Sequence, residues 1–212
     1  MTEKLGKLFG SVPRIKIMRL FLLNPEQGFT VAGVSERSKV SKAIVRREVS
    51  LLLGAGFISN KKVTEESINK RTGKRKTKSL PGFIINQNYQ YLKPIEKLLI
   101  EADFMKKTDL LKRFRPVGKI KLFIISGVFL QEANSRVDFM IVGDNIKKNT
   151  LENIIRKLEA EIGKELLYAV FETKDFLYRV SMYDKLIREV LDGPNEKVFE
   201  SAEFSTHLLQ KS

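Results

Sequence analysis

Between Ser11 and Ile85 the chain passes through helix, corner, helix and hairpin signals in an order that few small folds share. Ser11 and Pro13 predict a helix start, because a hydroxyl caps free N–H groups and proline is tolerated in the first turn. Residues 24–28 contain proline and glycine and end this helix. A very short strand is expected at Phe29–Val31, followed by a short helix over residues 31–38.

A second helix is expected directly after a tight corner at residues 38–41, with Ser41 as its N-cap. Gly54 and Gly56 suit its C-terminal end. Basic side chains at the N-terminal end of such a helix are what insertion into the major groove of DNA requires. The residues placed there are Lys39, Ser41, Lys42, Arg46 and Arg47. The face expected to be buried consists of Ile44, Val45, Val49, Leu51, Leu52 and Leu53.

Two strand-like segments follow, at residues 57–63 and 80–85, and they flank a polar and strongly basic stretch. Eight Lys and Arg residues occur from Lys61 to Lys78, against Glu65 and Glu66. We expect a hairpin whose basic side chains reach phosphates or the minor groove. Its candidate DNA contacts are Lys62, Lys70, Arg71, Lys74, Arg75, Lys76 and Lys78.

The positive charge is confined to one half of the chain. The 212 residues carry a formal net charge of +14. Residues 1–118 hold 25 Lys and Arg against 10 Asp and Glu, whereas residues 119–212 hold 14 against 15. Segregated charge of this kind indicates a polyanionic partner for the first half. The alternative is a solvated basic face without a partner.

Residues of about 8–100 resemble the winged-helix transcription regulators of bacteria and archaea. The stretch LFLLNPEQGFTVAGVSERSKVSKAIVRREVSLLLGAGFISNKK carries the resemblance. The resemblance implies binding of double-stranded DNA by the helix from Ser41 onward, with the hairpin as the wing. By analogy with such regulators we expect a homodimer. Arg46 and Arg47 could instead be ordinary exposed helix charges, and the basic hairpin a solvated loop.

Residues 86–114 read mostly as helix and could form a connector or a dimer helix. The expected organisation is therefore a nucleic-acid-binding domain over residues 1–88, a helical connector over 89–118 and a second domain over 119–212. The order of strands and helices predicts an α/β fold for the second domain and an α/β (α+β) class for the whole chain. Its expected elements are strands at 119–126, 137–142, 166–171 and 197–199 and helices at 149–162, 174–180 and 183–191.

The second half resembles the minimal nucleotidyltransferase fold of polymerase-beta-like enzymes. The resemblance rests on residues 126–129 and 135–144, with further similarity in LYAVFETKDFLYRV and REVLDGPNEKVF. Active members of that family carry a Gly-Ser turn and two carboxylates, spaced one residue apart, that hold Mg²⁺. Here Val128 replaces the serine and Arg136 replaces the first carboxylate, so only Asp138 remains. We expect Gly127, Arg136 and Asp138 to mark a vestigial nucleotide site, with Arg136 and Asp138 forming an ion pair.

The amino-acid composition excludes some classes of site and of protein. The chain has no cysteine and a single histidine, His207, so a zinc site built from Cys and His is not expected. No apolar run is long enough for a membrane span, and the first residues lack a signal peptide. We therefore expect a cytoplasmic transcription regulator that is not an enzyme and needs no metal or cofactor. Its effector, a small molecule or nucleotide, is left open. The alternatives are an active nucleotidyltransferase targeted by its winged helix and a protein that binds structured RNA.

Overall fold

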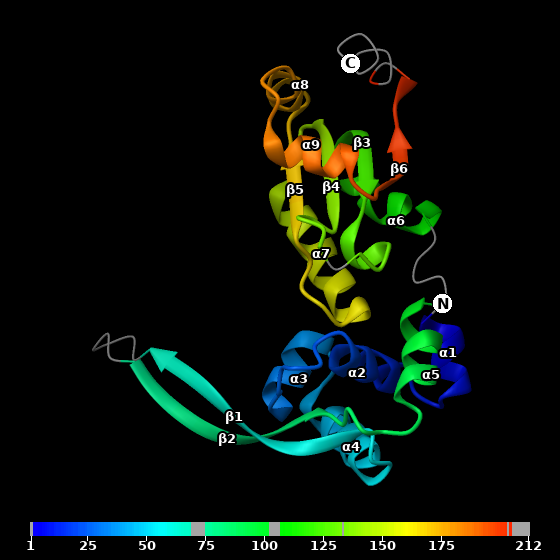
Figure 1. Cartoon of the computed structure of the whole chain (residues 1–212), viewed down its shortest axis with the longest axis vertical. Coiled ribbons are helices and arrows are strands. Elements are labelled where there is room, and N and C mark those ends of the chain that lie inside the picture. Colours follow the sequence, from blue (N-terminus) through cyan, green and yellow to red (C-terminus); the bar gives the residue numbers. More distant parts are fainter. Residues whose placement is uncertain (1, 69–74, 102–106, 133, 203, 205–212) are drawn as a thin grey trace. The chain divides into compact units, whose positions relative to one another are not determined.

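The computed structural model describes residues 2–68, 75–101, 107–132, 134–202 and 204 (Figure 1). Helices and two β-sheets make up a mixed α/β fold, which confirms the expected fold class. Contacts between residues divide the chain into two units. The first comprises Met1–Ala102 with Lys157–Lys164, and the second comprises Asp103–Arg156 with Glu165–Ser212. Within the described residues no helix is long and apolar enough to cross a membrane.

The first unit begins with a cluster of helices. Ser11 caps α2 as expected, since its hydroxyl oxygen accepts a hydrogen bond from the Arg14 amide at 3.2 Å. The core side chains of α2 include Ile15 and Phe21, and Phe21 makes an edge-to-face contact with Phe29 at 5.7 Å between ring centroids. The helices of this cluster are α1 (Thr2–Leu8), α2 (Val12–Leu22), α3 (Val31–Ser38) and α4 (Lys42–Gly54).

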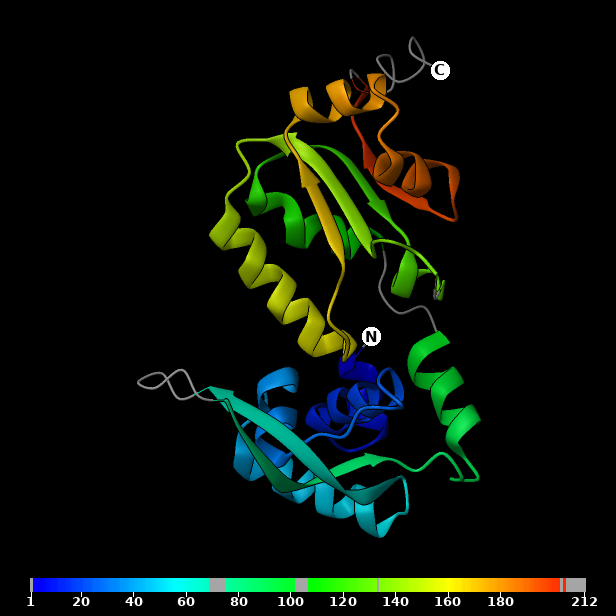
Figure 2. The same ribbon diagram turned by 60° about the vertical axis from the view of Figure 1, so that its left-hand side comes forward.

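A long antiparallel hairpin, β1 (Ile58–Ile68) and β2 (Arg75–Ile85), follows α4 and extends away from these helices (Figure 2). At its base Phe29 and Phe83 exchange two backbone hydrogen bonds of 2.8 Å, so the strand expected near Phe29 is a single bridge. The bridge ties the hairpin to the chain that enters α3.

The last part of the first unit consists of α5 (Leu92–Glu96) and the π-helical turn η1 (Lys97–Glu101). Arg19 of α2 is buried and donates from Nε to the carbonyl oxygen of Leu99 at 3.0 Å. Burial lowers the pKa of Arg19. This bond fixes η1 to the helical cluster.

The second unit is built on a four-stranded sheet with the order β5-β4-β3-β6. Strand β3 pairs antiparallel with β4 and β6, whereas β4 and β5 are parallel. The strands are β3 (Lys119–Ile125), β4 (Phe139–Asp144), β5 (Tyr168–Phe171) and β6 (Glu196–Glu200). The helical elements are α6 (Lys107–Phe114), η2 (Arg115–Val117), η3 (Gly127–Phe129), α7 (Lys148–Ile162), α8 (Thr173–Ser181) and α9 (Lys185–Asp192). The residues of α7 from Lys157 onward belong to the first unit.

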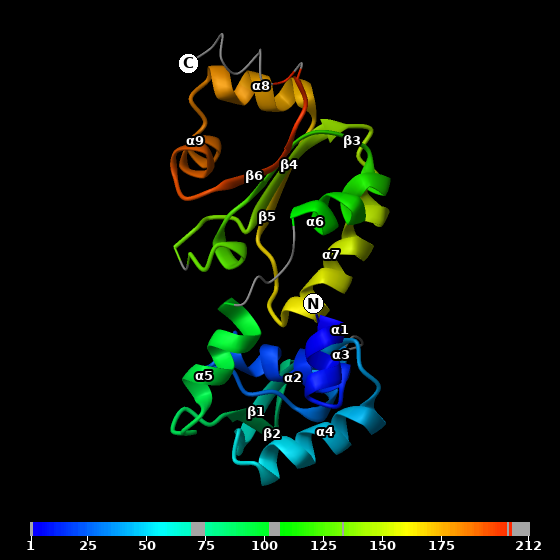
Figure 3. The ribbon, with the colours of Figure 1, turned by 90° about the vertical axis from the view of Figure 1, so that its right-hand side faces the viewer.

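Helices cover both faces of this sheet, with α6 and α7 on one side and α8 and α9 on the other (Figure 3). On the α6 side Phe114 packs against Phe123 and Phe139, with centroid distances of 5.0 and 5.5 Å. On the α8 side Phe176 and Ile187 join a buried cluster with alternate strand residues. Coverage of both faces explains why β3 and β4 read as continuous apolar runs in the sequence.

Candidate nucleic-acid interface

A three-residue corner joins α3 to α4. Lys39 adopts the left-handed conformation with φ of 54°, and this conformation ends α3. Two serine hydroxyls hold the turn: Ser38 donates to the Val34 carbonyl and Ser35 to the Val40 carbonyl, each at 2.6 Å. Ser41 precedes α4 in an extended conformation, as expected for an N-cap residue, although its side chain makes no capping hydrogen bond. The side chains of Lys39 and Ser41 are exposed.

One face of α4 is exposed and basic. Its residues recur at intervals of one, three and four, which places them side by side on the helix surface. The structure therefore brings together the sequence-predicted residues of α4, and solvent reaches all of them. The exposed residues of this face, here called the basic face, are Lys42, Ala43, Arg46, Arg47 and Ser50.

The buried face of α4 differs from the expected one. Val45, Val49 and Leu52 are buried as expected, but Leu51 keeps 51% of its surface exposed and Ile44 keeps 36%. The expectation for Ile44 and Leu51 was wrong because a straight helix can turn only one stripe toward the core, and Val45, Val49 and Leu52 occupy it.

Glu48 lies in that buried stripe, and the sequence analysis missed it. Its side chain is fully buried. It accepts hydrogen bonds from the Ser11 hydroxyl and from Nε of Arg14, each at 2.8 Å, and from Nη2 of Arg47 at 3.3 Å. The available signal was its spacing: Glu48 stands three residues after Val45, in register with the apolar side chains.

These bonds determine the charge state of Glu48. Burial alone would raise the pKa of the carboxyl group, but the hydrogen bonds from Ser11 and Arg14 outweigh burial and hold the pKa below its usual value. Glu48 is therefore a carboxylate at neutral pH, bound at the start of α2. Arg47 keeps 69% of its side chain exposed while it contacts this carboxylate.

The hairpin adds a second set of cations. Lys61, Lys62 and Lys78 are exposed on β1 and β2. The two strands pair over 11 residues each without a bulge, a paired length of roughly 36 Å at about 3.3 Å per residue. Among the other predicted contacts, Arg75 and Lys76 lie in β2 with side chains outside the described part, and Lys70, Arg71 and Lys74 lie outside the described residues altogether.

In the second unit, Asp138 has a structural role. It is only 5% exposed, and its two carboxylate oxygens accept the amides of Val128 at 2.7 Å and Leu167 at 2.8 Å. Gly127 has a φ of 53°, and a Cβ on it would collide with the Asp138 carboxylate. Asp138 thus connects the turn after β3 to the chain entering β5.

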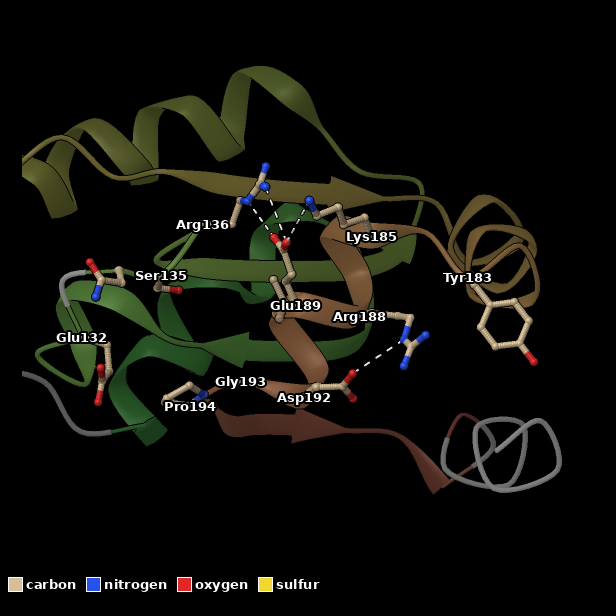
Figure 4. A pocket seen from close by; sticks show the side chains of 12 residues that line it. Glu132, Ser135, Arg136, Tyr183, Lys185, Arg188, Glu189, Asp192, Gly193 and Pro194 are labelled. Atoms are coloured by element: carbon tan, nitrogen blue, oxygen red, sulfur yellow. Dashed lines mark hydrogen bonds and ion pairs between the residues drawn. The ribbon is translucent and has the colours of Figure 1, made fainter.

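Arg136 does not pair with Asp138, so that expectation was wrong. Its Nε contacts the Glu189 carboxylate at 2.6 Å, and Lys185 lies 3.8 Å from the same group (Figure 4). Asp138 is buried instead, and its two oxygens accept backbone amides. Arg136 and Glu189 line a pocket of about 740 Å³, which contains neither Gly127 nor Asp138. The structure therefore does not bring the three residues of the expected nucleotide site to one surface.

Comparison with known proteins gave no relative to guide the interpretation of this interface. No protein-family model, no curated protein and no solved structure matches the chain.

Proposed function

We propose that the chain is a DNA-binding transcription regulator that grips duplex DNA with α4 and the β1–β2 hairpin, in the manner of a winged helix-turn-helix. The observation that carries the proposal is the two-sided character of α4. Its buried stripe anchors it to the core while the basic face with Lys42, Arg46 and Arg47 is open to solvent. An α-helix is 10–12 Å across, roughly the width of the major groove.

The hairpin supports the same proposal. Its paired length of roughly 36 Å is close to one turn of B-DNA, about 34–36 Å. Lys62 and Lys78 are exposed along it and are suited to phosphate contacts. Such contacts supply affinity without base preference, whereas side chains of α4 supply specificity. We place this activity in the cytoplasm, and by analogy with other regulators we propose a homodimer.

For the second unit we propose a nucleotidyltransferase-like domain that has lost catalysis and serves sensing, oligomerisation or docking. The burial of Asp138 and its hydrogen bonds from two backbone amides support the loss, because they give this carboxylate a structural role. Transfer of radiolabel from a nucleoside triphosphate in the presence of Mg²⁺ or Mn²⁺ would contradict this part of the proposal.

The central experiment measures binding of the full chain to random duplex DNA, duplex RNA and single strands across a salt series. Arg46→Ala and the double variant Lys62→Ala/Lys78→Ala are measured beside it. We expect tight, salt-dependent binding to duplex DNA that both variants weaken. Equal binding to all nucleic acids, or no effect of either variant, would contradict the proposal, and preference for duplex RNA would favour the structured-RNA alternative.

A further inference from the structure

We propose that Arg47 is the side chain of α4 that recognises guanine in the major groove, and that Glu48 is a positioning residue that orients the Arg47 guanidinium. This inference rests on the proposed function, since it assigns a base to one residue of the basic face. It goes beyond that function by separating the arginine that reads sequence from the cations that only hold the phosphate backbone.

Glu48 is an acceptor that is held in place by side chains outside α4. Two of its donors, Ser11 and Arg14, belong to the start of α2 and not to α4. With bonds of 2.8 Å to each, the carboxylate is fixed to the core of the first unit. Arg47 donates to the same carboxylate at 3.3 Å, so the outer end of its side chain has an acceptor that is held by α2.

Part of the Arg47 guanidinium remains free to donate hydrogen bonds to a ligand. A guanidinium has two forked edges, one formed by Nε and Nη2 and the other by Nη1 and Nη2, and Nη2 supplies one N–H to each. A single bond from Nη2 to Glu48 therefore leaves one whole edge available. A forked pair of donors matches the O6 and N7 acceptors of guanine. With 69% of the side chain exposed, solvent and a ligand can reach Arg47.

The neighbouring cations of the basic face differ from Arg47 in their contacts. Among the described residues, neither Arg46 nor Lys42 has a hydrogen bond or ion pair, and both side chains are exposed. A free side chain loses rotamer entropy when it is fixed on a base edge, whereas a side chain already held in place loses less. Arg47 is thus the pre-oriented arginine of the basic face, and Arg46 provides a matched control on the same helix.

The test is selection of preferred sites from a random duplex library with the full chain, followed by affinity measurements on the selected site and its single-base variants. Wild type is compared with Arg47→Lys, Glu48→Gln and the control Arg46→Lys. Lysine keeps the positive charge but lacks the planar pair of N–H donors that a guanidinium presents to O6 and N7 of guanine. We expect Arg47→Lys to lose about tenfold or more of the preference for guanine over the other bases at one base pair. Arg46→Lys should keep the preference.

Glu48→Gln separates positioning from a merely structural role. If Glu48 acts through Arg47, its substitution weakens the preference at that same base pair and adds nothing in an Arg47→Lys background. A uniform loss of affinity for all sequences would overturn the positioning role. Should Glu48→Gln unfold at the assay temperature, Glu48→Asp, which keeps the charge but withdraws the carboxylate by one methylene, is expected to give the same pattern.

Two further outcomes distinguish this inference from the proposed function. Selection of a site by wild type and by Arg47→Lys with the same guanine preference overturns the inference and leaves DNA binding intact. Binding to duplex DNA without any preferred base overturns it as well. Absence of any duplex binding removes the proposed function itself.

Discussion

Asp138 and Glu48 are both carboxylates with little or no exposed surface, and each has a fixed set of donors. Asp138 is held by two backbone amides, whereas Glu48 is held by side chains of α2 and α4. A buried acceptor that loses a partner pays the full cost of its desolvation, so both residues should be sensitive to small chemical changes.

Replacing Asp138 by asparagine should destabilise the second unit by about 2 kcal/mol, because an amide group offers one acceptor oxygen where two N–H donors need one each. Urea-induced unfolding followed by circular dichroism measures the change. Asp144→Asn, at the half-exposed end of the same strand, is the control and should shift the free energy of unfolding by less than about 0.5 kcal/mol. Equal effects of the two substitutions would refute the structural role of Asp138.

Glu48 should make the free energy of unfolding fall at acid pH. Its pKa is lowered in the folded state, so its stabilising contribution is complete above the unfolded value of about 4.3 and is lost as pH falls through the lower folded pKa. Thermal unfolding of wild type and Glu48→Gln should therefore differ at pH ~7 and converge as pH falls through the lowered folded pKa of Glu48. Glu26→Gln, at an exposed position, is the control for the loss of one carboxylate. A constant difference across this range would contradict the assignment.

Individual side-chain partners were the least predictable part of the chain. The exposure of Lys42, Arg46 and Arg47 followed from helical periodicity, a local property. The partner of Arg136 did not, because Glu189 is more than fifty residues away in the sequence and only tertiary packing brings it close. Glu48 was missed for the same reason: its donors Ser11 and Arg14 belong to another helix.

At the level of elements, the base of the hairpin is a tightly packed junction of the first unit. A Cβ on Gly82 would lie 2.5 Å from Cγ2 of Val63 and 2.7 Å from the carbonyl oxygen of Phe29. These distances leave no room for a methyl group beside the bridge between Phe29 and Phe83. The glycine thus permits three backbone segments to meet.

Gly82→Ala is expected to destabilise the first unit by about 1–3 kcal/mol, since either the bridge or the hairpin base must shift to make space. Thermal unfolding with amide hydrogen exchange at Phe29 and Phe83 measures the effect. Gly54→Ala is the matched control, because nothing lies within 4 Å of its added Cβ and alanine favours helix. Unaltered protection at both phenylalanines in Gly82→Ala would count against this account.

Most elements could be predicted from the sequence, because their signals are local. The helix after Ser41 and the strands of the second unit fall where apolar periodicity, caps and glycine breaks place them. The prediction for residues 86–114 was less detailed, because it gave one mostly helical stretch without its internal turn. The stretch contains the π-helical turn η1, whose Leu99 carbonyl accepts from the distant Arg19, and no local pattern signals that bond.

For the whole molecule, the distribution of charge is the property that matters for the proposed function. The first 118 residues carry all of the positive excess, whereas the rest is close to neutral. Each phosphate contact releases counterions and steepens the dependence of affinity on salt. The salt dependence should therefore report on the first half of the chain alone.

Lys62→Ala/Lys78→Ala should reduce the slope of log affinity against log salt by about 1, since the two lysines lie on opposite faces of the hairpin and one lost phosphate contact lowers the slope by about 1. Lys147→Ala/Lys148→Ala removes the same charge from exposed positions of the second unit and should leave the slope unchanged. Fluorescence anisotropy with labelled duplex DNA over a salt series measures both. A similar decrease in both variants would mean that binding follows net charge and not the hairpin.

The unbroken ladder of the hairpin limits how its length can change. Residues 58–68 pair one to one with residues 75–85, with no bulge to absorb an extra residue. Removing one residue from a single strand would turn every side chain beyond it to the opposite face, and Lys62 or Lys78 would then point away from its present surface. Lengthening or shortening the hairpin while keeping each side chain on its present face requires two residues in each strand. The length of such a hairpin is therefore adjustable only in discrete steps of roughly 7 Å.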